Sequence, residues 1–177
     1  ISNLSELTNA NCYVSCDYGT QNATVFLLWC KDRLGRWVCC REYYYSGRDE
    51  ERQKTDTEYA DDLEQWLDGI KPVKIVIDPS AASFIAELKK RGYAIKKAKN
   101  DVLDGIRFVA SLLNQGKIAI SDQCPNTIKE FGSYIWDQKA SERGEDKPVK
   151  QHDHAMDALR YFCYTIIRKP GSISILK

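Results

Sequence analysis

Several features that would assign this chain of 177 residues to a particular class of protein are missing from it. No apolar run approaches the roughly 18 residues of a membrane-spanning helix, and no signal peptide is recognisable, so the sequence predicts neither membrane insertion nor secretion. The net charge is only +1, which excludes a polycation that binds nucleic acid through charge alone. Internal repeats and low-complexity segments are also absent. One globular domain is the default, and a hydrophobic content of 43% supports its core.

Cysteine spacing excludes the usual structural zinc sites. The seven cysteines are odd in number, no two have Cys-x-x-Cys spacing, and neither histidine lies near a cysteine cluster. Most of them lie in apolar runs, which predicts small core residues in a reducing cytoplasm. The cysteines are Cys12, Cys16, Cys30, Cys39, Cys40, Cys124 and Cys163.

Charges of opposite sign are segregated along the chain. Between Arg48 and Asp68 there are nine acidic and three basic residues, whereas between Glu87 and Lys99 there are six basic residues and one acidic residue. A basic stretch can steer a phosphate backbone. The alternative is a solvated helix face followed by an edge strand that carries lysines.

The order of the apolar segments predicts an α/β fold. Three strands come first, and their short connections favour antiparallel pairing. Helices and strands then alternate, which favours parallel strands covered by helices. We therefore expect a mixed sheet, with three antiparallel strands and then parallel strands, flanked by helices. The expected strands are 12–16, 23–31, 37–45, 73–78, 93–98 and 117–121, and the expected helices are one capped by Thr55 or Thr57 that reaches Ile70, 81 to about 92, 102–115, and one from His154 onward.

Capping residues and polar segments complete this prediction. Ser80 is expected to cap the helix from Ala81, and Asp153 to cap the last helix. Residues 127–136 are expected to form a short amphipathic segment, and residues 137–151 a polar loop or small hairpin. Because the chain begins at Ile1 rather than methionine, we expect it to be a piece of a longer protein.

Two aspartates lie where an apolar strand ends. Asp17 follows the first predicted strand and Asp78 ends the fourth, and functional groups gather just beyond strand ends in such sheets. If these strands are neighbours, both carboxylates project into one space, and Gly19 would let the backbone bend close to a ligand. Each aspartate could instead be a turn residue only.

The last helix supplies a third carboxylate and an imidazole. His154 and Asp157 are three residues apart and share a helical face. Three converging carboxylates repel one another unless cations intervene, and Mg²⁺ or Mn²⁺ accepts such ligands. Two ions about 4 Å apart would favour phosphodiester hydrolysis. His154 could complete a metal shell or move a proton, and it could also be an ordinary histidine at a helix start.

Four sequence blocks resemble a known family in family order. They are residues 14–22, 77–84, 99–107 and 147–150 leading into the last helix, so the likeness extends over about residues 12 to 165. The blocks resemble the nuclease domain of the large terminase subunit of tailed bacteriophages, in the ribonuclease H-like superfamily. The resemblance implies a metal-dependent endonuclease that uses Mg²⁺ or Mn²⁺, two ions in all, to cut concatemeric double-stranded viral DNA during packaging.

The resemblance also implies a role for each candidate residue. Asp17 would bridge both metal ions, Asp78 would bind one of them and Asp157 the other. His154 matches a histidine found near the metals in one branch of the family. Asp153 would be a helix cap or would lie behind the ligands, with metal ligation as the lesser alternative.

Further implications concern DNA and partners. Lys147 and Lys150 lie where family members carry a loop or hairpin beside the active site, so they are candidate phosphate contacts. No Gly-x-x-x-x-Gly-Lys-Ser/Thr loop occurs, so we expect residues 1–177 to be a single nuclease domain that lacks the ATPase motor. The implied partners are that ATPase domain in the full-length protein, the small terminase subunit and the portal protein, in the host cell cytoplasm and without a membrane.

Three other classes of protein remain open. A ribonuclease H-like resolvase or transposase core would use the same ions on another DNA shape. A sugar-kinase or actin-like domain is suggested by residues 17–20, which resemble the first phosphate loop of that group, although no second glycine-rich loop is visible. A DNA-binding or docking module with a decayed centre is the third alternative, and the presence of all three acids argues against it.

Overall fold

The fold is built on one mixed sheet of six strands in the order β5-β4-β1-β2-β3-β6. The computed structural model describes residues 11–19, 22–132 and 153–168. In the sheet, β2 pairs antiparallel with both β1 and β3, whereas β1–β4, β4–β5 and β3–β6 are parallel. The strands are β1 (Tyr13–Asp17), β2 (Ala23–Lys31), β3 (Trp37–Ser46), β4 (Lys74–Ile77), β5 (Ile95–Lys97) and β6 (Ile118–Ile120).

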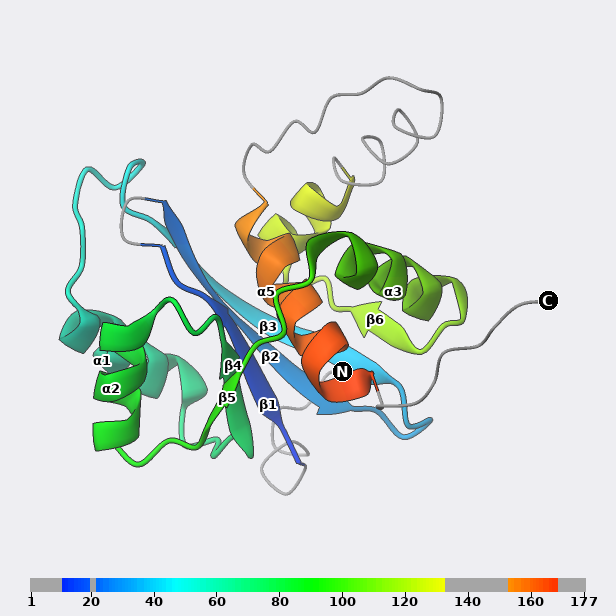
Figure 1. Cartoon of the computed structure of the whole chain (residues 1–177), viewed down its shortest axis with the longest axis horizontal. Helices are drawn as coiled ribbons and strands as arrows, with labels where there is room; N and C mark the ends of the chain where they lie inside the picture. Colours follow the sequence, from blue (N-terminus) through cyan, green and yellow to red (C-terminus); the bar gives the residue numbers. More distant parts are fainter. Residues whose placement is uncertain (1–10, 20–21, 133–152, 169–177) are drawn as a thin grey trace.

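Helices cover both faces of this sheet (Figure 1). On one face lie α1 (Asp56–Leu67) and α2 (Ala82–Lys90), and on the other lie α3 (Val102–Asn114) and α5 (His154–Phe162). Helix α5 continues as a short π-helix, Cys163–Ile167, and residues 125–132 are also helical. The result is a three-layer arrangement in which α5 packs directly on β1, β2 and β4.

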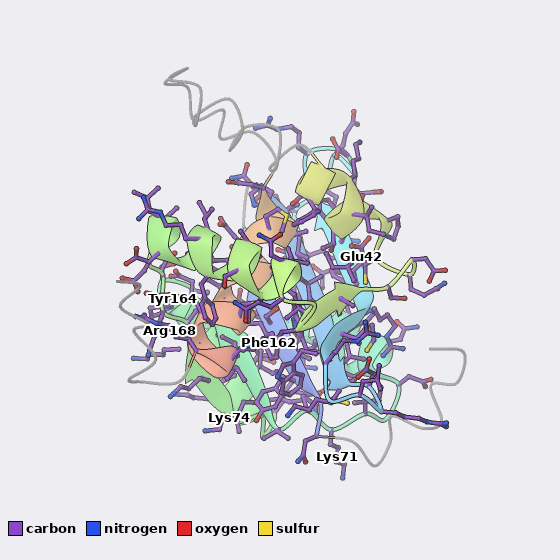
Figure 2. All side chains as sticks on the ribbon, turned by 90° about the vertical axis from the view of Figure 1, so that its right-hand side faces the viewer. Glu42, Lys71, Lys74, Phe162, Tyr164 and Arg168 are labelled. Carbon is purple, nitrogen blue, oxygen red and sulfur yellow. The ribbon has the colours of Figure 1, made fainter. Side chains whose placement is uncertain are left out.

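Strand β2 explains why the sequence shows a continuous apolar run there. Phe26 and Leu28 belong to the core under α1 and α2, whereas Leu27 and Trp29 belong to the core under α3 and α5. Because successive side chains point to opposite faces, a strand covered on both faces must be apolar throughout. On the second face Phe162, labelled in Figure 2, stacks on Trp29 with ring centroids 4.3 Å apart. This contact fixes the C-terminal end of α5 against the sheet.

The predicted fold is confirmed, and the structure corrects some of its details. Helix α1 begins with a capping box, in which the side chains of Thr55 and Glu58 each accept a hydrogen bond from the other residue's backbone N–H. The helix ends at Leu67 and does not reach Ile70, because the backbone of Asp68 is in the left-handed conformation. Strand β6 joins the sheet beside β3, at the edge opposite β5. Six of the seven cysteines are buried, as predicted, and Cys40 is half-buried.

Ser80 does not cap α2, contrary to the prediction. The N-cap position falls on Ala81, which makes no side-chain capping bond. The backbone N–H of Ser80 instead donates to Asp78 Oδ1 at 2.8 Å. The carboxylate of Asp78 therefore forms the local turn that the serine hydroxyl was expected to organise.

The segregated charges meet across α1 and α2. Arg91 forms ion pairs with Asp61 at 2.7 Å and Glu64 at 3.3 Å on the acidic helix α1, and with Glu87 at 2.9 Å on α2. The lysines of β5 are exposed at the sheet edge, which matches the predicted edge strand with lysines. Among the residues that the structure describes, no helix is both long enough and apolar enough to cross a membrane.

Candidate metal centre

Asp17 and Asp78 lie side by side at one edge of the sheet. Asp17 is the last residue of β1, Asp78 directly follows β4, and the parallel register pairs Cys16 with Ile77 immediately before them. Because neighbouring parallel strands deliver their carboxyl ends to the same edge, the two acids share one location, as predicted.

Helix α5 brings His154 to Asp17. The imidazole Nδ1 lies 2.9 Å from Asp17 Oδ2, and the two side chains are only 19% and 15% exposed. Burial raises the pKa of Asp17, His154 opposes this shift, and the charges of Asp153 and Asp78 add to it. The pKa of His154 is raised, chiefly by its hydrogen bond to Asp17. The pair therefore tends to hold a proton.

Asp157 lies in the same cluster but has a different partner. The buried guanidinium of Arg160 donates to Asp157 Oδ1 at 2.9 Å. Burial raises the pKa of Asp157, Arg160 opposes the shift, and the charges of Asp17 and Asp153 raise the pKa further. Helix α5, which carries Asp157, packs directly on β1, whose last residue is Asp17.

Asp78 uses both carboxylate oxygens in hydrogen bonds. Besides the bond from Ser80 to Oδ1, the amide Nδ2 of Asn100 donates to Oδ2 at 2.7 Å. The same Asn100 accepts a hydrogen bond from Arg160 at 3.0 Å through its Oδ1. Asp78 and Asp157 are therefore joined through two intervening side chains that the sequence analysis did not single out.

Asp153 lies at the start of α5 as predicted, but its side chain does not make the predicted capping hydrogen bond. It is the N-cap residue of α5 by position, yet its side chain caps nothing. Glu130 does this instead, because its Oε2 accepts from the backbone N–H of Ala155 at 2.8 Å and of Met156 at 3.2 Å. Asp153 contributes its charge to the acidic cluster, where it raises the pKa of Asp17 and of Asp157.

Glu130 itself is held by a second carboxylate that caps its helix. Glu42 of β3, labelled in Figure 2, accepts hydrogen bonds from the backbone N–H of Asn126 at 2.7 Å and of Thr127 at 2.9 Å. These bonds fix the start of the helix 125–132 that carries Glu130. Burial raises the pKa of Glu130 to about 7, although the hydroxyl of Tyr44 donates to it at 3.0 Å.

Gly19 lies tightly against the chain itself, and its expected approach to a ligand stays a prediction. A Cβ atom there would lie 2.7 Å from the carbonyl oxygen of Ala23, so the space is taken by the chain itself. The glycine allows the turn after Asp17 to fold back on β2. Lys147 and Lys150, the candidate phosphate contacts, lie outside the described residues.

The donor set fits a hard divalent cation, although the side chains do not yet enclose one. In the part of the chain that the structure describes, no three His, Cys, Asp or Glu side chains converge tightly enough to hold a metal ion. The cluster nevertheless offers carboxylate oxygens and an imidazole, and the acids raise one another's pKa. Carboxylates that repel one another in a partly buried site are the groups that Mg²⁺ or Mn²⁺ neutralises.

Three residues of this site were missed by the sequence analysis. Arg160 had a detectable signal, since it lies three residues after Asp157 and faces it on the same helix. Asn100 lies inside the block 99–107, but the resemblance assigned it no role. Glu130 gave no local signal, because the α5 backbone groups that it caps are 25 and 26 residues away.

Comparison with known proteins is consistent with this geometry. The model of the terminase RNase H-like domain family matches residues 32–164. The large terminase subunit of Escherichia phage T5 is 32% identical over 130 residues, which are 71% of this chain and 30% of that protein. The large terminase structure of the thermophilic bacteriophage D6E is 54% identical with a TM-score of 0.81, over 90% of this chain and 41% of that one.

A more distant structure supports the fold alone. The nuclease domain of the large terminase of bacteriophage SPP1, solved with bound Mn, is 21% identical with a TM-score of 0.64, over 91% of this chain and 90% of that domain. The chain thus spans less than half of the T5 and D6E proteins and nearly all of an isolated nuclease domain. Together, the family match and the T5 identity show that this chain belongs to the terminase RNase H-like domain family.

Proposed function

We propose that residues 1–177 form the nuclease domain of a large terminase subunit, which cleaves concatemeric double-stranded viral DNA during genome packaging by metal-dependent phosphodiester hydrolysis. The observation that carries this proposal is that Asp17 and Asp78 end neighbouring parallel strands and that α5, which carries Asp157, packs across both strands. The structure of the SPP1 nuclease domain with bound Mn supports a divalent cation. The T5 and D6E proteins are large terminases, which supports packaging.

In this proposal each acidic residue holds metal ions. Asp17, the most central, would bridge two ions of Mg²⁺ or Mn²⁺, Asp78 would bind one and Asp157 the other. When bound, such ions polarise the scissile phosphate and lower the pKa of a water molecule. The chain's own contribution is to fix the carboxylates in a partly buried site, where their charges interact strongly with a cation.

His154 has two roles in the proposal. Its Nδ1 orients the Asp17 carboxylate through Oδ2, and its raised pKa allows the ring to carry a proton close to neutral pH. The ring can therefore accept or release a proton beside the reacting phosphate. Direct binding of His154 to a metal would require the imidazole to exchange its bond with Asp17 for one with the ion.

The full-length protein would supply the remaining functions. The D6E large terminase has been solved with ADP and with ATP-γ-S, and this chain covers about 40% of it. We infer that an ATPase domain accompanies this nuclease domain in the complete protein. The small terminase subunit and the portal protein are the further proposed partners, and the host cell cytoplasm is the proposed location.

Plasmid cleavage with and without metal tests the proposed activity. The chain should nick or linearise supercoiled plasmid in Mn²⁺ or Mg²⁺ between about pH 7 and pH 9, and EDTA should stop the reaction. Gel electrophoresis of the time course is the measurement. Intact plasmid throughout that range with fresh metal would refute an autonomous nuclease, and cleavage that persists in EDTA would refute metal dependence.

Replacement of His154 separates orientation from proton transfer. His154→Ala should lower the cleavage rate about 10- to 100-fold, because Asp17 loses the partner that fixes it. The loss should be larger at low pH, since His154 opposes the raised pKa of Asp17 and the acid must be ionised to bind metal. His154→Asn, which can still donate to Asp17, should recover metal affinity but not the full rate. Equal rates for wild type and both variants would make His154 a structural residue only.

A further inference from the structure

We propose that Asn100, Arg160 and Gly105 form a positioning relay that fixes the carboxylates of Asp78 and Asp157 relative to each other. The inference rests on the proposed function, since it concerns how two metal-binding groups from separate elements are held in one arrangement. None of the three relay residues is proposed to bind metal. They act through the two aspartates.

The relay is continuous in hydrogen bonds. Asn100 donates to Asp78 Oδ2 at 2.7 Å and accepts from Arg160 at 3.0 Å. The same terminal nitrogen of Arg160 donates to Asp157 Oδ1 at 2.9 Å. Each carboxylate oxygen in these bonds has a second lone pair, so it can still accept a cation. The relay therefore restrains both acids without saturating them.

The segment that carries Asn100 is anchored on both sides. The backbone N–H of Ala98 donates to the carbonyl of Ile77 at 2.8 Å, directly before Asp78. The backbone N–H of Lys99 donates to Thr165 Oγ1 at 3.0 Å, in the π-helix that continues α5. Asn100 is thus fixed to the two elements whose acids it joins, which is the placement that a positioning residue requires.

Arg160 is buried with one of its nitrogens left without a partner among the described residues. Its side chain is only 4% exposed, and its Nε has no hydrogen-bond partner among the described residues. A buried guanidinium with an unsatisfied nitrogen is poor evidence of a stabilising ion pair. Its remaining bonds run to Asp157, Asn100 and, at 3.4 Å, the carbonyl of Asp101. The guanidinium also lies over the Tyr161 ring at 4.9 Å, so its hydrogen bonds reach the acids and the segment of Asn100 while its face packs on the core.

Gly105 of α3 makes room for this guanidinium. A Cβ atom at Gly105 would lie 2.8 Å from both Cγ and Cδ of Arg160, closer than side chains tolerate. Glycine inside a helix costs stability relative to alanine, so its presence here has a packing reason. Asn100, Asp101 and Gly105 all lie in the block 99–107, and the relay accounts for these three members of the block.

Two variants test the relay, each with a matched control. Asn100→Ala removes the central link, and Asn114→Ala is its control at an exposed position near the end of α3. Gly105→Ala displaces Arg160, and its control is Gly132→Ala, where a new Cβ would meet nothing within 4 Å. The readouts are Mn²⁺ affinity by electron paramagnetic resonance titration and metal-free thermal unfolding, in addition to plasmid cleavage.

We expect both relay variants to bind Mn²⁺ about 10- to 100-fold more weakly than wild type, because residues that orient metal ligands contribute on this scale. The controls should match wild type. The double variant Asn100→Ala/Gly105→Ala should bind Mn²⁺ only slightly more weakly than whichever single variant binds it less tightly. Both changes break the same chain of contacts, so their effects on Mn²⁺ affinity should not add. Thermal unfolding of Asn100→Ala should stay close to wild type.

The result separates the relay from the proposed function. Wild-type Mn²⁺ binding together with relay variants that match their controls would overturn the relay and leave the nuclease proposal intact. Losses that simply add in the double variant would overturn a shared relay. Failure of the wild type to bind Mn²⁺ would overturn the nuclease proposal, and the relay with it.

Discussion

Replacing Asp17 by asparagine is expected to abolish DNA cleavage and leave the fold intact. The variant keeps the shape of the side chain but loses the charge that is proposed to bridge two cations. Metal ions supply several kcal/mol of transition-state stabilisation, which corresponds to a rate loss of about 1,000-fold or more. Plasmid cleavage in Mn²⁺ measures this loss, and Asp49→Asn, at an exposed position, is the matched control.

The same variant makes a second prediction, about stability. The pKa of Asp17 is raised in the folded chain, so its ionised form is less favourable there than in the unfolded chain. A neutral amide avoids that cost, and the metal-free unfolding temperature should be equal to or higher than that of wild type at neutral pH. Full cleavage activity would remove Asp17 from the centre. A large fall in unfolding temperature would show instead that its pair with His154 is mainly structural.

The two acids of the candidate site that lie on the sheet, Asp17 and Asp78, could be predicted from where the apolar runs end. Asp17 and Asp78 each stand at the end of a short apolar run, where a polar residue marks the point at which a strand leaves the core. Their adjacency also followed from the fold class, because β1 and β4 pair in a mixed sheet of this kind. Local sequence therefore indicated the two residues, whereas their common edge was conditional on the pairing of β1 with β4, which the structure shows.

The helix-borne half depended on contacts that local sequence does not encode. Asp157 is placed near the ends of β1 and β4 only because α5 packs across these strands, although its partner Arg160 lies on the same helix. Asn100 and Arg160 are 60 residues apart, and no periodicity links them. The capping predictions for Ser80 and Asp153 were wrong for two different reasons, one local and one not. The Asp78 side chain formed the turn at Ser80, and Glu130, from a separate helix, capped α5.

Arg160 and His154 are the basic partners of Asp157 and Asp17, and they bear on the proposed binding of a cation. Each neutralises one acid, yet the pKa values of Asp17 and Asp157 are still raised by burial and by neighbouring acids. A site with enough internal cations would show lowered values instead. In the proposed function, the negative charge that this partial neutralisation leaves would be satisfied by a divalent ion.

Glu130 should control how the stability of the metal-free chain depends on pH. Burial raises its pKa from 4.5 to about 7, so the folded chain binds the proton more tightly than the unfolded chain does. A raised pKa gives stability that is fully present below about pH 4.5 and is lost as the pH rises through about 7. The free energy of unfolding should fall by about 2 to 3 kcal/mol over this range, which is less than the full shift in the Glu130 pKa would give because water and the helix N-terminus stabilise the carboxylate.

Glu130→Gln isolates this contribution from the other titrating groups. The amide is neutral at every pH and its oxygen can still accept from the N–H groups of Ala155 and Met156, so urea unfolding in EDTA should give a flatter pH profile than wild type. Asp17, Asp157 and His154 also have raised pKa values and will leave a residual slope of the same sign. The exposed Glu50→Gln variant should keep the wild-type profile.

The Glu130 result also bears on the metal centre, because the residue caps the helix that carries His154 and Asp157. Glu130→Gln keeps the bonds from Ala155 and Met156 and loses only the interaction of the negative charge with the N-terminus of α5, so the first turn that carries those two groups changes little. Glu130→Gln should therefore weaken Mn²⁺ binding only a few-fold, far less than Asp17→Asn. An unchanged pH profile would assign the stability loss to the acidic cluster itself rather than to the cap.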